Sequence, residues 1–221
     1  MDIQILYEDK DLLFCRKPTG IPSQPDPSGQ LDLLTALSSS YPNIHLIHRL
    51  DTPTGGIMVF GLSQRATAKL GSLVQDHSLF KKEYLAVLSK RPQDDSGELR
   101  DFLYHDKRAN KAYVTDSARK GSKEAILNYK IISTAEDGHT LALIHLHTGR
   151  THQIRVQFAS RGFPLVGDGK YGSREKCPYI GLWAYKLSFD HPMTEQNISC
   201  AAKPDISLFP WSLFSESIEQ I

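Results

Sequence analysis

Short runs of apolar and alternating residues, separated by polar turns, dominate the chain. Runs of roughly four to eight such residues bounded by Gly, Pro, Asn or Asp predict β-strands. We therefore expect strands over residues 4–9, 11–18, 56–63, 81–90, 124–133, 139–149, 180–192 and 197–204. The polar stretch 91–110 is expected to form a short hairpin or an insertion.

Three segments have helical spacing instead. The first is residues 31–40, and the second begins after Ser63, which is placed to cap it. The third ends near Gly162, with Ile154 and Phe158 four residues apart. Many short strands with few helices lack the rhythm of a parallel βαβ protein. We predict an α+β fold with a mixed, mostly antiparallel central sheet flanked by helices and loops.

The composition is that of an ordinary globular protein. Of 221 residues, 40% are hydrophobic and 23% charged, which fits one large domain or two small ones. Lys and Arg number 26 against 25 Asp and Glu, so the formal net charge is +1. This balance neither supports nor excludes a nucleic-acid partner, because a local basic patch is what binds phosphates.

Cysteine usage and the N-terminal stretch indicate a cytoplasmic protein without a membrane partner. Cys15, Cys177 and Cys200 are far apart and form no C-x-x-C pair, so neither a disulfide framework nor a cysteine zinc site is indicated. No apolar run approaches the roughly 20 residues that span a bilayer. The start, MDIQILYEDK, lacks the basic and apolar stretches of a signal peptide.

The stretch HRLDTPTGG, His48–Gly56, combines a base, a fixed cation, a carboxylate and two glycines. Its Pro-Thr-Gly-Gly turn leads from Asp51 into a strand, and such a turn can hold a carboxylate rigidly at a sheet edge. Gly55 and Gly56 permit another backbone to approach closely. The alternative is structural, because an Asp in a turn often only accepts hydrogen bonds from that turn.

The stretch HLHTGRTHQIRV, His145–Val156, is rich in histidine and arginine. His145 and His147 lie on the same face of the expected strand, and with His152 they could ligate a metal ion. However, the stretch contains no carboxylate, and its arginines would repel a divalent cation. The metal interpretation is therefore the weaker one.

An anion site fits the same stretch better. Residues 148–151 turn into the start of a helix, which offers backbone N–H groups beside the guanidinium groups of Arg150 and Arg155. The remaining alternative is that one of these arginines pairs internally with a carboxylate.

Three further stretches give weaker signals on their own. KKEYLAVL places Tyr84 on one face of a strand, where tyrosine is usually a core or cross-strand residue. RKPTG puts Lys17 beside a constrained turn. PLVGDGKYGS (Pro164–Ser173) is a glycine-rich loop with Asp168 and Tyr171, but it lacks the spacing of a phosphate-binding loop.

Taken together and in this order, the stretches resemble the RluA-type pseudouridine synthase family. RKPTG is similar to the family's first motif, and HRLDTPTGG to its signature H-R-L-D-x-x-T-S/G-G, which carries the catalytic aspartate. KKEYLAVL is similar to its K-x-Y motif and HTGRTHQIRV to its T-G-R-x-H-Q-I-R motif. With PLVGDGKYG and LWAYKLSFDHP, the resemblance extends from about Leu12 to about Pro192.

The resemblance implies roles for individual residues. Asp51 is expected to be the catalytic carboxylate, Arg155 to pair with it, and Tyr84 to contact the target base. Arg49 is expected to enter the RNA stack as the target nucleotide leaves it. Contacts with RNA are expected from Arg49, His48, Lys17, Lys82, Arg150, Thr151, His152 and Gln153. For the basic residues among them, the alternative is that they are solvated surface charges.

The implied reaction sets what the site must supply. Isomerisation of uridine to pseudouridine breaks a C–N bond, rotates the base and forms a C–C bond, without oxidation or gain of a group. We therefore expect no cofactor and no metal. Asp51 would either attack the sugar carbon or remove its 2′ proton, and both routes need an ionised carboxylate. A guanidinium such as that of Arg155 would keep it charged.

The expected partner is structured RNA, ribosomal or transfer, and no obligate protein partner is evident. We expect a single catalytic domain over residues 1–221, without the N-terminal S4-type RNA-binding module that many relatives carry, and a monomer by default. Two interpretations from other classes remain. One is an RNA-binding protein on the same fold that lacks activity, and the other is a histidine-metal hydrolase.

Overall fold

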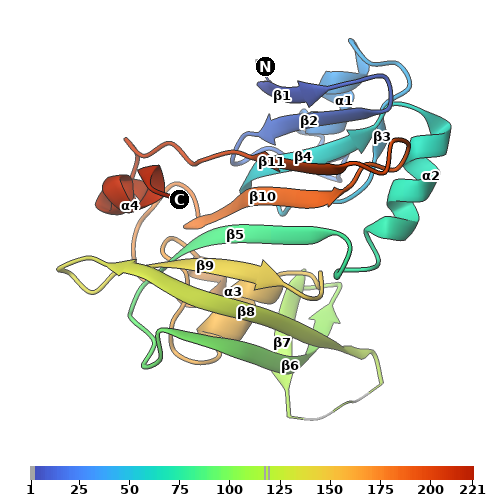
Figure 1. Ribbon diagram of the computed structural model, residues 1–221. Coiled ribbons are helices and arrows are strands. Elements are labelled where there is room, and N and C mark those ends of the chain that lie inside the picture. Colours follow the sequence, from blue (N-terminus) through green and yellow to red (C-terminus); the bar gives the residue numbers. More distant parts are fainter. Residues whose placement is uncertain (1–2, 117, 119) are drawn as a thin grey trace. The chain divides into compact units, whose positions relative to one another are not determined.

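The computed structural model describes residues 3–116, 118 and 120–221. The chain divides into two compact units, whose elements are labelled in Figure 1. The first unit comprises Met1–Lys82 and Trp183–Pro204, and the second comprises Glu83–Leu182 and Asp205–Ile221. Within the described ranges, no helix is both long enough and apolar enough to cross a membrane.

Strands β2 and β4 lie at the centre of the first unit, and their burial follows from their continuous apolar sequences. β4 runs antiparallel to β2 and β3 and parallel to β10, while β1 and β11 run antiparallel to β2 and β10. The strands of this unit are β1 (Ile5–Glu8), β2 (Leu12–Lys17), β3 (His45–Leu46), β4 (Gly55–Gly61), β10 (Leu182–Asp190) and β11 (Asn197–Ala201).

Two short helices belong to the first unit, α1 (Leu33–Ser38) and α2 (Gln64–Leu73). The prediction that Ser63 caps α2 is confirmed, because its Oγ accepts a hydrogen bond from the Ala66 N–H at 3.2 Å. The same hydroxyl donates to Asp11 Oδ1 at 2.6 Å, which ties the start of α2 to the turn before β2.

The strands of the second unit follow the order β5-β9-β8-β6-β7, with every neighbouring pair antiparallel. The turn between β8 and β9 contains Gly138, whose φ is +89°. The bounds are β5 (Lys81–Leu88), β6 (Ser96–Asp106), β7 (Lys111–Thr115), β8 (Ser122–Thr134) and β9 (Thr140–Leu146).

The expectation of only a short hairpin or insertion over 91–110 was wrong in its length. β6 has 11 residues and pairs with β8 from Ser96 to Tyr104, while β7 completes the hairpin. Only Leu99 and Leu103 of β6 are buried, so the polar sequence gave little sign of a strand. The strand is held by its backbone pairing with β7 and β8 and by these two buried leucines.

Helix α3 packs against β6 and β7. Val156 of α3 forms a buried cluster with Leu103, Ala112 and Ala125. As predicted, the helix ends before Gly162, whose φ is +84°. The helical elements of this unit are α3 (Gln153–Ala159), η1 (Gly169–Tyr171), η2 (Trp211–Phe214) and α4 (Ser215–Glu219). Many antiparallel pairings with few short helices confirm the predicted mixed, mostly antiparallel fold.

Candidate active site

The backbone on both sides of Asp51 is fixed by hydrogen bonds within the first unit. The Ser23 hydroxyl donates to the Leu50 carbonyl at 2.8 Å and accepts from the Leu50 N–H at 3.0 Å. The Thr52 carbonyl accepts from the Gly20 N–H at 2.9 Å. A turn closed by the Thr54 N–H on the Asp51 carbonyl, at 2.9 Å, completes the arrangement. Asp51 thus sits on a loop that the neighbouring segments hold in place.

Lys17 takes part in holding this loop. Its ammonium donates to the carbonyls of Pro18 at 3.0 Å, Ile21 at 2.5 Å and Thr52 at 3.3 Å. Burial lowers the pKa of Lys17 to about 7, and the nearby charge of Asp51 acts in the opposite direction. The side chain is 0% exposed, so its expected place in a phosphate-binding patch does not fit the structure. Lys17 instead joins the turn after β2 to the turn that carries Asp51.

His48 and Lys82 both lie near the ring of Phe80. The His48 ring centroid is 6.1 Å from that of Phe80, and Lys82 Nζ is 5.2 Å from the same ring. His48 Nε2 accepts a hydrogen bond from the Val59 N–H at 3.2 Å. Burial, followed by the charge of Lys82, lowers the pKa of His48 to about 3, and burial lowers the pKa of Lys82 to about 8. Among residues 48–51 of the motif, Arg49 is the exposed one.

The two glycines that end the Asp51 motif serve packing, as predicted. A Cβ on Gly56 would lie 2.2 Å from the Ala184 carbonyl oxygen of β10, and its φ of +123° is one that other residues rarely adopt. A Cβ on Gly55 would lie 2.3 Å from the Trp183 ring. The glycines therefore allow the backbones of β4 and β10 to approach closely directly after the Asp51 turn.

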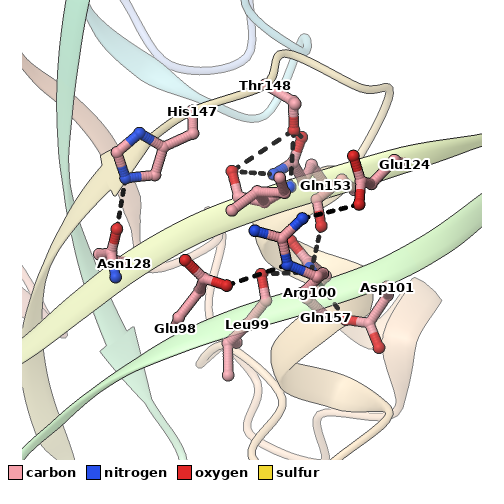
Figure 2. Close-up of polar contacts among 12 residues, drawn as sticks. Glu98, Leu99, Arg100, Asp101, Glu124, Asn128, His147, Thr148, Gln153 and Gln157 are labelled. Carbon is pink, nitrogen blue, oxygen red and sulfur yellow. Dashed lines mark hydrogen bonds and ion pairs between the residues drawn. The ribbon is translucent and has the colours of Figure 1, made fainter. Parts of the chain in front are cut away.

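In the second unit, the loop over 148–151 is organised by Gln153 of α3 (Figure 2). Its Oε1 accepts from the Thr148 hydroxyl at 2.7 Å and from the Arg150 N–H at 3.0 Å, and its Nε2 donates to the Ile126 carbonyl at 3.1 Å. The side chain of Gln153 is thereby committed to the loop. The Arg150 N–H, one of the groups expected to face an anion, is satisfied inside the protein.

Arg155 forms a buried, two-pronged ion pair with Asp168. Its Nε lies 2.7 Å from Oδ2 and its Nη2 lies 2.8 Å from Oδ1. The guanidinium also lies 5.2 Å from the centroid of the Tyr171 ring. The ion pair is the internal pairing that the sequence left open as an alternative. Asp168 along the edge of the guanidinium and the Tyr171 ring near it together fix the guanidinium plane.

Tyr171 connects this pair with its surroundings. Its hydroxyl accepts from the Ala112 N–H at 2.8 Å and lies 2.9 Å from His152 Nδ1. His152 is buried, and its φ of +54° begins α3 in a left-handed conformation. His152 is therefore part of the scaffold around Arg155, whereas Thr151 and Arg150 are exposed.

The histidines of this stretch do not converge. His145 and His147 are exposed, His147 Nε2 contacts Asn128 Oδ1 (Figure 2), and His152 contacts Tyr171. Across the part of the chain that the structure describes, no three His, Cys, Asp or Glu side chains form a group that could hold a metal ion.

Comparison with known proteins decides the family. A family model described as RNA pseudouridylate synthase matches residues 11–160. The chain belongs to the RNA pseudouridylate synthase family. The RNA pseudouridine synthase YlyB of Bacillus subtilis is 31% identical over 214 residues, covering 91% of this chain and 69% of the relative. The dual-specificity RNA pseudouridine synthase RluA of Yersinia pestis is 29% identical over 208 residues, covering 90% of this chain and 98% of the relative.

Solved structures agree with the synthase fold. Human RNA pseudouridylate synthase domain containing 1 has a TM-score of 0.80 at 24% identity. The match covers 95% of this chain and 86% of the human chain. Human RNA pseudouridylate synthase domain containing 4 has a TM-score of 0.77 at 21% identity, with 98% and 93% covered. The resemblance to RluA-type synthases is thus confirmed, and the synthase is an isomerase.

The predicted site residues of the synthase fall into two groups. Lys17, His48, Arg49, Asp51 and Lys82 belong to the first unit, where Lys17 directly supports the Asp51 turn. The second unit holds Tyr84, Arg150, Thr151, His152, Gln153 and Arg155. Tyr84 is buried in β5, opposite Ile144 of β9. The expected pairing of Asp51 with Arg155 joins residues of different units and stays a prediction.

Sequence reasoning assigned no role to the residues that support this site. Ser23 fixes the backbone before Asp51, and Asp168 and Tyr171 orient Arg155. A signal existed for Asp168, because a carboxylate in a tight glycine-rich loop 13 residues after Arg155 could have been considered as the partner of an internal pair. Ser23 lies in a Pro-rich loop and had no such signal.

Proposed function

We propose that this synthase converts specific uridines of structured RNA, ribosomal or transfer, into pseudouridine, with Asp51 as the catalytic carboxylate. The observation that supports this role most directly is the fixed backbone on both sides of Asp51, at Leu50 and Thr52. A carboxylate that must meet one atom of a ribose needs such a support, because small displacements of a reacting group cost large factors in rate.

The chemistry needs the carboxylate and little else. Asp51 acts on the ribose, by attack at the sugar carbon or by removal of the 2′ proton, and the C–N bond breaks. The freed uracil rotates and its C5 bonds to the same sugar carbon. On the first route the bond from Asp51 to that carbon breaks as C5 attacks, and on the second the 2′ proton returns from Asp51 to the sugar. The C5 proton then leaves, and N1 takes up a proton. Electrons and atoms balance without an oxidant. The reaction therefore needs no cofactor.

Arg155 is proposed to hold Asp51 ionised. Support comes from its anchoring: Asp168 takes two of its nitrogens and Tyr171 lies against its face. A guanidinium oriented in advance loses little entropy when it meets a further carboxylate. A lysine at this position could not reproduce the planar, forked arrangement.

Arg49 and Tyr84 are proposed to serve the extrusion of the nucleotide. A stacked uridine is out of reach of the carboxylate, and flipping it costs a few kcal/mol. Arg49 is exposed and lies two residues before Asp51, so it can fill the vacated space with a planar group that stacks and donates hydrogen bonds. Tyr84 is proposed to offer its ring to the flipped base.

Tritium release from RNA labelled at the uracil C5 tests the proposal, because each turnover frees that hydrogen. Cellular RNA serves as substrate, and we expect release by the wild type. Asp51→Asn should abolish release while RNA binding persists, since the amide keeps the shape but not the charge. Asp94→Asn, which changes an exposed carboxylate, is the matched control and should release tritium as the wild type does.

Two outcomes would count against the proposal. Full activity of Asp51→Asn would remove the carboxylate from the mechanism. Binding of RNA without release from any cellular RNA would instead favour an RNA-binding protein that lacks activity. Mapping pseudouridine in RNA from cells with and without the protein then identifies the modified positions.

A further inference from the structure

Positive charge is concentrated in one segment of the second unit, which begins at the hairpin of β6 and β7. Residues 105–123 contain six Lys or Arg and two Asp, a net charge of +4, while the whole chain has a net charge of +1. The rest of the chain is therefore net negative, at −3. Lys107 and Arg108, at the tip between β6 and β7, are exposed, as is Lys120 before β8. None of these residues belongs to a motif of the family resemblance.

The same hairpin presents tyrosine on one face of the sheet. Tyr113 of β7 lies directly opposite Tyr104 of β6, so the two side chains share a face. Their neighbours Leu103 and Ala112 point to the other face, where they pack against Val156 of α3. Tyr113 therefore lies on the face away from α3, and it is 42% exposed.

Lys111 belongs to the same face as Tyr113, two residues before it. Its Nζ lies 5.6 Å from the centroid of the Tyr113 ring. An ammonium held beside an exposed aromatic ring provides a cation for a phosphate next to a flat surface for a base. We define the hairpin surface as the four residues Lys107, Arg108, Lys111 and Tyr113.

The hairpin surface is well ordered by hydrogen bonds. Asp106 Oδ1 accepts from the N–H groups of Arg108 at 2.8 Å and Ala109 at 3.2 Å, which closes the tip. The Asn110 carbonyl accepts from Lys170 at 3.0 Å, which ties the tip to the loop of Asp168. A surface fixed in this way loses little conformational entropy on binding.

We propose that the hairpin surface is a second RNA-contact site of the synthase, which binds phosphates through its basic residues and stacks an unpaired base on Tyr113. The proposal rests on the proposed function, because it takes RNA as the ligand. Cations interleaved with an exposed aromatic side chain on a sheet face suit single-stranded RNA in particular. An acidic protein would use the charges but would have no need of the ring.

The position of the surface connects it to the proposed chemistry. Lys111 Nζ lies 5.4 Å from the ring centroid of Tyr171, the ring that lies against the Arg155 guanidinium. Lys111 therefore lies between the exposed ring of Tyr113 and the ring that packs against the Arg155 guanidinium.

Binding of a fluorescein-labelled single-stranded oligouridine, followed by anisotropy over a series of salt concentrations, tests the phosphate contacts. The double variant Lys107→Ala, Arg108→Ala should bind more weakly, and its slope of log K against log salt should be smaller by roughly 1.4, for two lost contacts of about 0.7 each. The matched control is Lys90→Ala, Lys130→Ala, which removes two exposed cations of the same unit that lie outside the hairpin surface. The control should retain the wild-type slope.

The stacking contact is tested separately. Tyr113→Leu should weaken oligouridine binding about 5- to 100-fold without changing the salt slope, whereas Tyr113→Phe should bind as the wild type does. Thermal unfolding of each variant shows whether the hairpin is intact, and Tyr113→Phe keeps the question decidable if Tyr113→Leu unfolds. Equal losses in the hairpin and control pairs would overturn the proposal. Tighter binding of polyglutamate than of oligouridine would overturn it in favour of an acidic protein partner.

Turnover separates this proposal from the proposed function. The hairpin variants should raise KM for tritium release and leave kcat unchanged, while Asp51→Asn should lose kcat and keep its affinity for oligouridine. If no RNA releases tritium, the proposed function is wrong, but the oligouridine binding measurements still test the hairpin surface. Wild-type KM in the hairpin double variant, with normal release, defeats the hairpin surface alone.

Discussion

Arg155 shows how a single side chain can be prepared for its role by neighbours that never meet the substrate. Two of its nitrogens face the two oxygens of Asp168, and both residues are at most 4% exposed. A charge buried to this degree is stable only when it is paired, so the pair must persist throughout turnover. At this scale the loop of Asp168 belongs to the site as much as the helix of Arg155.

We predict that disruption of this pair harms both folding and turnover. Asp168→Asn removes the carboxylate that pairs with two nitrogens of the buried guanidinium, and we expect a loss of about 3–5 kcal/mol in the free energy of unfolding by urea. Arg155→Lys keeps the charge but loses the fork, so tritium release should fall at least about ten-fold. The control is Arg161→Lys, because Arg161 pairs with Asp101 in the same two-pronged way but is 34% exposed. That change should cost under about 1 kcal/mol.

The sequence reveals the role of a residue when its type alone indicates that role, but not when the role depends on contacts with distant segments. The charged members of the motifs stand out by type, and the alternative of an internal Arg–carboxylate pair was correct. Lys17 was misassigned because a basic residue beside a turn looks the same whether its ammonium faces solvent or three carbonyls. That difference arises only when distant segments fold together.

At the scale of elements, β4 and β10 illustrate a constraint that acts through the backbone. Their parallel pairing aligns Gly56 with Ala184 and Gly55 with Trp183. The space between these strands is too small for a side chain at either glycine. Since Asp51 lies four residues before Gly55, the pairing of β4 with β10 also sets where the turn of Asp51 begins.

Gly56→Ala should therefore destabilise the synthase by more than about 2 kcal/mol, because the new Cβ meets the Ala184 backbone and φ is unfavourable. Gly71→Ala is the control: it lies inside α2, with open space around the new methyl group. That change should stabilise the protein by about 0.5–1 kcal/mol. Urea unfolding compares the two, and equal stabilities of the two variants would contradict the argument from close approach.

The elements with a continuous or capped pattern could be predicted, and those with an open polar surface could not. β4 is apolar throughout and buried throughout. Ser63 is a residue type that commonly caps helices, and it therefore indicates the start of α2. β6 carries polar residues because it covers little core, and β7 and α4 are too short to show a period. Their positions follow from pairing and packing with segments far away in the sequence.

For the whole molecule, a net charge near zero conceals an uneven distribution. Residues 105–123 of the second unit are strongly basic, and the rest of the chain is net acidic. Cations with a structural task are withdrawn from the surface, as with the buried Lys17. Whole-chain composition could not predict the proposed RNA-contact face, because the net charge averages the basic segment with the acidic remainder. The expectations of a single catalytic domain and of a monomer stay predictions.

Stability of the whole molecule against acid offers a further prediction, which depends on His48. Burial holds the pKa of His48 near 3, below its ordinary value of 6.5, and the neutral ring accepts a hydrogen bond from the Val59 N–H. Between these two values the unfolded chain binds a proton at His48 that the folded chain does not. The contribution of His48 to stability is therefore complete above pH 6.5 and is lost as the pH falls toward 3, by up to about 1.4 kcal/mol per pH unit.

His48→Gln should remove this dependence, because the amide oxygen can accept the same hydrogen bond and does not titrate. The free energy of unfolding of wild type and of His48→Gln is measured by urea at a series of pH values. As the pH falls below 6.5, the wild type should lose stability relative to the variant. His45→Gln, at an exposed position of β3, is the control and should produce a much smaller trend. Parallel pH profiles for wild type and His48→Gln would show that the folded protein accepts the proton at His48 without penalty. His48 would then be able to carry charge near pH 6.5, and its proposed part in contacting RNA would gain a cation in place of a structural acceptor.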